Sequence, residues 1–201
     1  MAANFARFLN NSRHADTTVH IYDFELPVHS VILAAQSDFF DKAFDSQMKE
    51  CQSKSIHFNE GSAHAYWRVF EYIYTGNYTE DPSPILEEED NDFTKDLRVY
   101  VLADMFLMEK LKEYAFQRFK AKIQQLWMSD MFIDCIKEVY NTCKNGDRIR
   151  GAVVEIAIKH ICDLWKKQQF HGLVHQVGDF AEDLIGEFPE TKRKDSLGSW
   201  T

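Results

Sequence analysis

Apolar and polar residues alternate over the first sixty positions in a way that is typical of short strands. β-branched and aromatic residues crowd together over 17–22, which predicts a strand. Residues 24–28 alternate apolar with polar positions and predict the second strand of a hairpin, in which Pro27 favours an edge position. Residues 54–58 form a third extended segment. The pattern therefore predicts a small sheet near the start of the chain.

Helical spacing of apolar residues predicts helices around these strands. A short amphipathic helix over 5–9 precedes the first strand. Two short helices follow the hairpin, over 31–35 and 38–44, because Ser37 lies between them and can cap the second one.

A longer helix is predicted between two residues that suit helix ends. Ser62 can cap its N-terminus, and Gly76 can adopt the left-handed conformation that commonly follows the last helical residue. Two further apolar stripes, over 97–105 and 111–123, predict a helical hairpin.

The last third of the chain shows only helical stripes. They cover 132–143, 153–165 and 173–185, and the polar residues after Pro189 predict a frayed end. No strand pattern interrupts them.

These elements predict a chain of two structured parts. We expect an α+β domain over 1–125, a helical extension over 126–188 and a flexible tail over 189–201. An acidic loop insertion over 79–93 interrupts the first part.

The formal charge of −9 is concentrated in that loop. Seven acidic residues and no basic ones lie between Glu80 and Asp92, so the rest of the chain carries only about −2. Direct binding of nucleic acid needs clustered Lys and Arg, and the sequence therefore argues against it. Apolar stretches long enough for a membrane span or a secretory leader do not occur. We expect a cytoplasmic or nuclear protein without membrane contact, whose four scattered cysteines are reduced.

Residues that could support catalysis or hold a metal lack the surroundings that such chemistry needs. His29, Ser37 and Asp16 could form a triad, but no nucleophile elbow surrounds the serine. His171 and His175 would share one face of a helix, but no third ligand is indicated. We therefore expect a protein without enzymatic activity, cofactor or metal.

Several short motifs follow one another between residues 14 and 120. They are Asp16-Thr17-Thr18-Val19, Leu26-Pro27-Val28-His29-Ser30-Val31-Ile32-Leu33-Ala34-Ala35, Ser37-Asp38-Phe39-Phe40, Met48-Lys49-Glu50, Phe70-Glu71-Tyr72-Ile73-Tyr74-Thr75-Gly76 and Val101-Leu102-Ala103-Asp104-Met105-Phe106. In order and approximate spacing this set resembles the BTB/POZ family. The resemblance implies the BTB/POZ fold, a small β-sheet capped by a cluster of helices, followed here by an all-α extension. Kelch, MATH and zinc-finger patterns do not occur in the sequence.

The resemblance also implies structural roles for individual residues. Asp16 and His29 are expected to anchor backbone in the core, and Ser37 to cap a helix. Four further positions complete the structural signature: Tyr74, Gly76, Ala103 and Asp104.

The partners that the resemblance implies are other proteins. Family members that recruit a cullin scaffold carry a hydrophobic-x-Glu motif after the corresponding helix, and Met48-x-Glu50 matches it. Family members commonly dimerise through their first helix, where Phe5, Phe8 and Leu9 are candidate contacts of a homodimer. The leading hypothesis is an adaptor or scaffold, in its most specific form a substrate adaptor of a cullin-type ubiquitin ligase. The alternative is an oligomerisation module of a transcription-regulatory or other scaffold complex.

Overall fold

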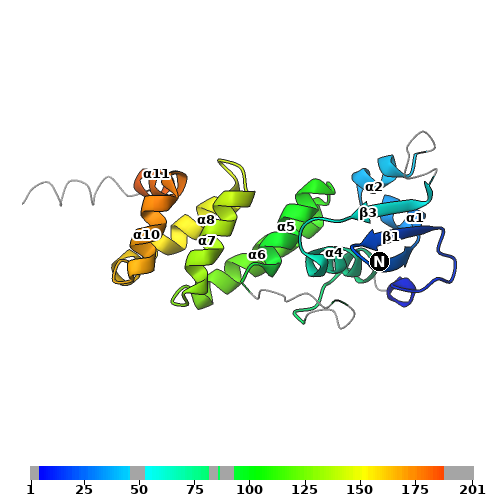
Figure 1. The fold of residues 1–201 in the computed structure, drawn as a ribbon, viewed down its shortest axis with the longest axis horizontal. Coiled ribbons are helices and arrows are strands. Elements are labelled where there is room, and N and C mark those ends of the chain that lie inside the picture. Colours follow the sequence, from blue (N-terminus) through cyan, green and yellow to red (C-terminus); the bar gives the residue numbers. More distant parts are fainter. Residues whose placement is uncertain (1–4, 46–52, 82–85, 87–92, 188–201) are drawn as a thin grey trace, which may run out of the picture. The chain divides into compact units, whose positions relative to one another are not determined.

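The computed structural model describes residues 5–45, 53–81, 86 and 93–187 of the chain. The chain divides into two units, Met1–Gln117 and Arg118–Thr201, each with its own internal packing. Their boundary falls inside one long helix, α6 (Glu109–Leu126). Figure 1 shows the first unit in blue to green and the second in green to orange.

Three strands form the sheet of the first unit. They are β1 (Thr17–Ile21), β2 (Phe24–Val28) and β3 (Ser55–Phe58), in the order β2-β1-β3. β1 pairs antiparallel with β2 and parallel with β3, so Val19 lies opposite both Leu26 and Ile56. All three of these side chains are buried, because alternate residues of each strand face the core. The prediction that the strand with Pro27 lies at an edge is confirmed.

The four longer helices that surround the sheet begin and end within two residues of the bounds that the sequence predicts. Their bounds are α1 Ser30–Ala34, α2 Asp38–Ala43, α4 Ala63–Thr75 and α5 Lys95–Met105. The Ser37 hydroxyl accepts the N–H of Phe40, and the Ser62 hydroxyl accepts the N–H of Ala65. Gly76 ends α4 with φ 79°, a left-handed conformation that glycine adopts without steric cost.

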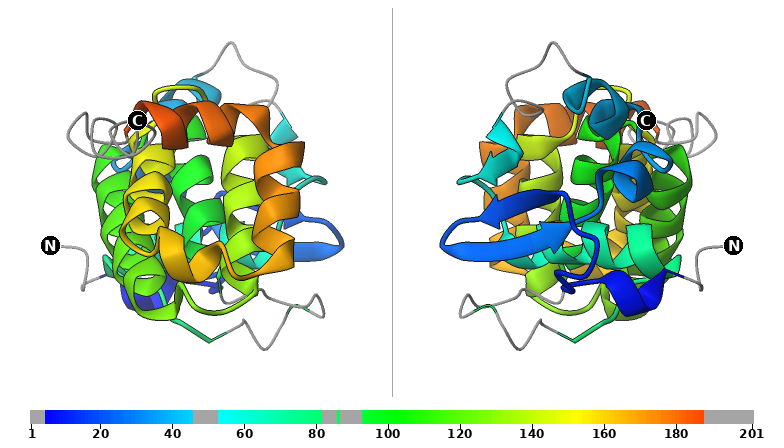
Figure 2. Two further views of the ribbon diagram at one scale, coloured as in Figure 1. Left: turned by 90° about the vertical axis from the view of Figure 1, so that its left-hand side faces the viewer. Right: turned by 90° about the vertical axis from the view of Figure 1, so that its right-hand side faces the viewer.

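The predicted helix over 5–9 is shorter than the sequence suggests. It is a single 3₁₀ turn, η2 (Ala6–Phe8), because Leu9 is already extended with ψ 129° and Asn10 turns back with φ 51°. None of its residues is buried. The right-hand view of Figure 2 shows this dark-blue turn beside α4, with which it is in contact.

An aromatic cluster forms the centre of the first unit. The ring of Phe106 lies 4.9 Å from Phe40 and 5.5 Å from Phe58, and the rings of Phe40 and Phe70 are 5.9 Å apart. These residues come from α2, β3, α4 and the end of α5. Aromatic side chains bury much apolar area, so this cluster fixes the end of α5 against α2.

The second unit is entirely helical over its described residues. Its helices after α6 are α7 Met131–Thr142, α8 Arg148–Lys159, α9 Ile161–Leu164, α10 Gln168–Gln176 and α11 Gly178–Gly186, which the left-hand view of Figure 2 shows in yellow-green to orange. In the part of the chain that the structure describes, no helix has the length and apolarity to cross a membrane.

Two of the predicted helices in this unit are each broken in two. The stripe over 153–165 breaks at His160, whose ring stacks on Trp127 at 3.7 Å. The stripe over 173–185 breaks at Val177, where ψ is 82°. The bend brings Phe180 edge-on against Phe170, 6.0 Å between ring centroids. The apolar spacing in the sequence continues through both positions, so tertiary packing and not the sequence pattern determines where these helices end.

Candidate functional site

Asp16 ties the start of the sheet to the start of α1. Its two carboxylate oxygens accept hydrogen bonds from Ser30, one from the backbone N–H at 2.8 Å and one from the hydroxyl at 2.5 Å. Partial burial raises the pKa of Asp16, but the hydrogen bonds from Ser30 outweigh this effect and hold the pKa below its usual value. Asp16 is exposed, so this anchor lies at the surface and not in the core.

His29 and Tyr74 form a buried chain of hydrogen bonds. The Tyr74 hydroxyl accepts the backbone N–H of His29 at 3.0 Å and lies 2.9 Å from its Nδ1. The other ring nitrogen, Nε2, lies 2.9 Å from the carbonyl oxygen of Arg13. A carbonyl can only accept, so Nε2 carries the proton, and Nδ1 then accepts from the tyrosine hydroxyl. Each polar atom in this series of hydrogen bonds has a partner. The series joins α4 and the β2–α1 junction to the N-terminal segment.

The three residues that could have formed a catalytic triad have separate partners. His29 binds Tyr74 and Arg13, whereas Asp16 binds Ser30. The Ser37 hydroxyl donates to the carbonyl of Phe106 at 2.6 Å while it caps α2. The arrangement is therefore structural.

His171 and His175, the candidate ligand pair of the second unit, do not form part of a metal site among the described residues. His171 lies 2.6 Å through Nε2 from the carbonyl of Trp165, and His175 is exposed. Over the described ranges, no group of three or more His, Cys, Asp or Glu side chains could hold a metal ion.

An exposed apolar surface lies where the end of α5 meets the start of α2. Met105 is 44% exposed and Leu107 is 50% exposed, and between them Phe106 points into the core. The ring of Phe39 on α2 lies 5.1 Å from that of Phe106. We call Phe39, Met105 and Leu107 the α2–α5 surface.

The backbone of Leu107 is left-handed, with φ 56°. A leucine in this conformation costs about 1–2 kcal/mol, so the turn between α5 and α6 keeps an exposed apolar residue at a position that glycine would occupy more cheaply. Strain of this kind often marks a functional position.

The two other signature residues of α5 lie beside this surface. Ala103 is fully buried, and its carbonyl accepts the N–H of Met108. Asp104 is exposed and pairs with Lys112 at 2.6 Å. Met48 and Glu50 lie outside the described residues; in the sequence, Met48 comes five residues after Ala43, the last residue of α2.

The three candidate dimer contacts differ in exposure. Phe5 is 37% exposed, whereas Phe8 and Leu9 are half-buried. The ring of Phe8 packs edge-on against His29 at 5.2 Å. Phe5 is therefore the apolar side chain that this segment presents most openly.

The second unit contains a buried arginine that the sequence analysis did not single out. Arg150 donates to the carbonyl oxygens of Cys143 and Tyr140, and its guanidinium lies 4.4 Å from the Tyr140 ring centroid and 3.4 Å from Asp179. The Tyr140 hydroxyl in turn donates to Asp183 at 2.6 Å. Burial and this hydrogen bond to a carboxylate both raise the pKa of Tyr140. A charged residue at helical spacing from Val153, Val154 and Ala157 was the signal that could have revealed it.

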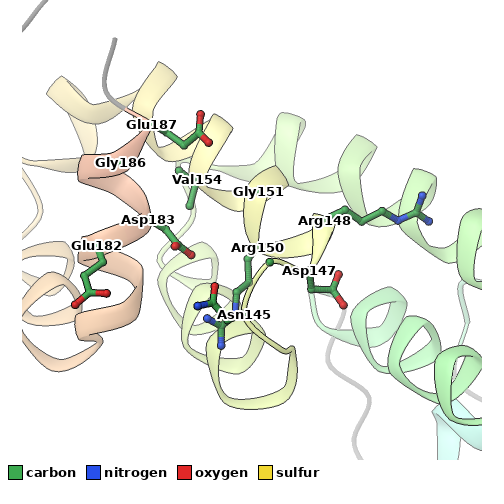
Figure 3. A pocket seen from close by; sticks show the side chains of 11 residues that line it. Asn145, Asp147, Arg148, Arg150, Gly151, Val154, Glu182, Asp183, Gly186 and Glu187 are labelled. Carbon is green, nitrogen blue, oxygen red and sulfur yellow. The ribbon is translucent and has the colours of Figure 1, made fainter. Parts of the chain in front are cut away.

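A cavity of about 390 Å³ lies between α8 and α11 next to this arginine. Figure 3 shows Asp183 and Arg150 on neighbouring helices, with Glu182 also on α11 and Glu187 directly after its last residue. Carboxylates and arginines both line the cavity, and Asp183 and Arg150 already bond to other residues. The cavity therefore has mixed charge and no reactive nucleophile.

A family model described as "BTB/POZ domain" matches residues 5–123. The chain belongs to the BTB/POZ family. The resemblance seen in the sequence motifs is thereby confirmed, together with an α+β fold. A BTB domain is a protein-interaction fold, so the surfaces of this unit are places where another protein can bind.

Two curated relatives match most of this BTB chain. It is 25% identical over 176 residues to Kelch repeat and BTB domain-containing protein 4 of Homo sapiens, covering 84% of this chain and 28% of the relative. It is 26% identical over 177 residues to Armadillo BTB Arabidopsis protein 1 of Arabidopsis thaliana, covering 85% and 21%. The chain thus spans less than a third of the length of these relatives.

Solved BTB domains are also similar to the chain. The BTB domain of zebrafish PATZ1 matches with a TM-score of 0.46 and 17% identity, over 60% of this chain and 89% of that one. The BTB domain of human Gigaxonin matches with a TM-score of 0.41 and 20% identity, over 57% and 83%.

Removing the Tyr74 hydroxyl should destabilise the BTB unit. In Tyr74→Phe the buried N–H of His29 and its Nδ1 lose their partner, which costs about 1–3 kcal/mol of unfolding free energy in urea titrations. Tyr22→Phe, which removes an exposed hydroxyl, should cost less. An equal loss in both variants would contradict the role of the buried chain.

The same substitution should change the response to alkaline pH. Burial raises the pKa of Tyr74 from 10.0 to about 12, against the opposing effect of the hydrogen bond from His29. As pH rises, the unfolded chain therefore loses the Tyr74 proton at a lower pH than the folded protein does. The wild type loses stability as pH rises from about 10 to about 12. Tyr74→Phe should lose less over the same range.

Replacing the buried arginine should destabilise the second unit. Arg150→Met leaves two buried carbonyls without their charged donor and costs about 3 kcal/mol in chemical unfolding. Arg148→Met, at an exposed position on the same helix, should change stability by less than about 0.5 kcal/mol. Comparable losses of unfolding free energy in the two variants would contradict the stabilising role of the buried Arg150 contacts.

Proposed function

We propose that this chain is a non-enzymatic adaptor whose BTB domain recruits a cullin to a ubiquitin ligase. The observation that carries the proposal is the α2–α5 surface, exposed apolar side chains on a domain of a protein-interaction family. Met105 and Leu107 expose enough apolar area to act as contact residues at the centre of an interface. Methionine also adapts its shape to a partner pocket.

The sequence after α2 supports the choice of a cullin. Met48-x-Glu50 matches the hydrophobic-x-Glu motif of family members that recruit cullins, and it begins only a few residues beyond Ala43, the last residue of α2. Phe39 of the α2–α5 surface lies on the helix that the motif follows in the sequence, and a single partner that contacts both would use the apolar side chains of each. The acidic residue of the motif would add charge selectivity at the edge of that contact.

The helical extension supports an adaptor in a second way. The match to the human kelch and BTB relative covers 84% of this chain, which is more than residues 5–123 account for. Similarity to a protein with both BTB and kelch parts therefore continues into the helices of the second unit. Similarity over both units fits an adaptor that uses the extension in partner binding.

Binding to a purified cullin N-terminal domain tests the proposal. Titration calorimetry with the full chain should show binding, and Met48→Ala/Glu50→Ala should weaken it at least about tenfold, as expected for loss of interface anchors. Leu107→Gly should weaken it as well while leaving the melting temperature unchanged or higher, because glycine relieves the left-handed strain.

The matched control changes one apolar and one acidic residue elsewhere on the first unit. Val31→Ala/Glu25→Ala removes side chains that are 73% and 72% exposed, and it should bind like the wild type. Absence of cullin binding by the wild type, or equal binding by all variants, would rule the proposal out.

We also propose that the BTB unit self-associates through its N-terminal segment. Phe5 supports this proposal, since an exposed aromatic side chain beside a half-buried Phe8 and Leu9 is typical of an interface anchor. The alternative role of the chain as an oligomerisation module depends on this contact.

Sedimentation velocity tests the self-association. The wild type should be a dimer at micromolar concentration, and Phe5→Ser should raise the dissociation constant at least about tenfold. Val31→Ser, a similar loss of an exposed apolar side chain, should leave it unchanged. If the wild type is a monomer throughout the micromolar range, the dimer proposal is refuted, and the cullin proposal is not affected.

A further inference from the structure

The N-terminal segment of the BTB unit forms a small basic pocket. Arg7, Phe8, Asn11, Arg13 and His14 line it, and its volume is about 190 Å³. Sites for whole small molecules measure roughly 300–1,000 Å³, so this pocket fits one chemical group and not a cofactor. We call these five residues the N-terminal basic pocket.

The backbone of this pocket is held in place by local hydrogen bonds. Asn11 donates through its amide to the carbonyl of Arg7 at 3.1 Å and accepts the N–H of Arg13 at 2.9 Å. His29 donates to the carbonyl of Arg13, which connects the pocket to the buried Tyr74 hydroxyl. The loop is therefore organised before any ligand arrives, which lowers the entropic cost of binding.

The aromatic member of the pocket is also fixed. Phe8 packs edge-on against His29, and the guanidinium of Arg7 lies 4.8 Å from the centroid of the Phe8 ring. His14 holds a left-handed backbone with φ 65°. Arg7 is thus kept at the pocket, and the turn through His14 places an imidazole at its wall.

The positive charge of the pocket has no counter-charge among the described residues. Neither Arg7 nor Arg13 makes an ion pair with any described carboxylate, although acidic residues outnumber basic ones in the chain by 32 to 23. Asp16 is the nearest acidic residue in the described sequence, and both of its oxygens bind Ser30. The pocket is therefore an uncompensated cationic site on an acidic protein.

We propose that the N-terminal basic pocket binds the phosphate of a phosphorylated serine or threonine in a partner protein. The two guanidinium groups of the pocket carry a charge of +2. A ligand with a single carboxylate, of charge −1, would neutralise only half of it. A phosphate monoester carries about −1.5 to −2 at neutral pH and offers three acceptor oxygens. Guanidinium groups bind such oxygens in pairs, and arginine clusters commonly read phosphorylated motifs.

The distribution of charge favours a protein as the source of the phosphate. A nucleic-acid site needs a basic stripe that follows many phosphates. The pocket instead gathers its two arginines within seven residues, in a chain of charge −9. A single dianionic group on a peptide is the ligand that matches this arrangement.

Fluorescence anisotropy with a labelled peptide library tests the proposal. The library carries one fixed phosphoserine between degenerate positions, and matched libraries carry serine or glutamate instead. The full chain should bind the phosphoserine library at least about tenfold more tightly than either of the others, since charge-assisted hydrogen bonds to phosphate are lost with them.

Variants of the pocket complete the test. Arg7→Gln/Arg13→Gln should abolish the preference for phosphoserine. Lys110→Gln/Lys144→Gln removes the same charge at exposed positions elsewhere and should keep it. Both variants should melt like the wild type, because the four side chains are exposed.

Inorganic phosphate provides a direct readout of the site. Added at constant ionic strength against chloride, it should shift the ¹H–¹⁵N side-chain signals of Arg7 and Arg13 and leave that of Arg148 in place. Equal binding of the serine or glutamate library, an unchanged preference in Arg7→Gln/Arg13→Gln, or unshifted arginine signals would each overturn the proposal. None of these outcomes depends on binding to a cullin.

Discussion

The Tyr74 hydroxyl is the point on which much of the first unit depends. It accepts the backbone N–H of His29 and bonds to the ring of the same histidine, all within a buried environment. An unpaired N–H there would cost the desolvation of that group, so the tyrosine stabilises the position of the histidine at the start of α1. Through Nε2 the same imidazole fixes the carbonyl of Arg13. One hydroxyl therefore connects the core helix α4, the end of the hairpin and the segment that carries the N-terminal basic pocket.

A second constraint acts at the other end of the unit. Phe106 contacts the rings of Phe39, Phe40 and Phe58, and its carbonyl accepts the hydroxyl of Ser37. Burying this one residue forces its neighbours outwards and places Leu107 in a left-handed turn. The exposed α2–α5 surface is thus a consequence of core packing. An interaction domain can keep such a surface, because the free energy that the left-handed turn costs is small compared with the free energy gained by burying the Phe106 side chain.

The second unit buries a charged side chain, and hydrogen bonds again offset the cost of its desolvation. Arg150 is buried among apolar residues, and two carbonyl oxygens and the face of Tyr140 satisfy its guanidinium. The turn between α7 and α8 and the packing of α11 meet at this residue. Because only the partnered arginine can be buried at acceptable cost, it specifies how these helices fit together.

Much of this protein follows from the sequence alone, because helix and strand patterns and caps act over short distances. The three strands, the caps at Ser37 and Ser62 and the glycine that ends α4 were all visible in the order of residues, as was the family. The tertiary structure decided what depends on contacts between distant residues. It broke the stripes at His160 and Val177, reduced the first helix to one turn and left Phe5 more exposed than Phe8. It also gathered Arg7, Arg13 and His14 into one pocket by way of a hydrogen bond from His29. Periodicity records which face of an element is apolar, whereas only packing determines which distant side chain meets it.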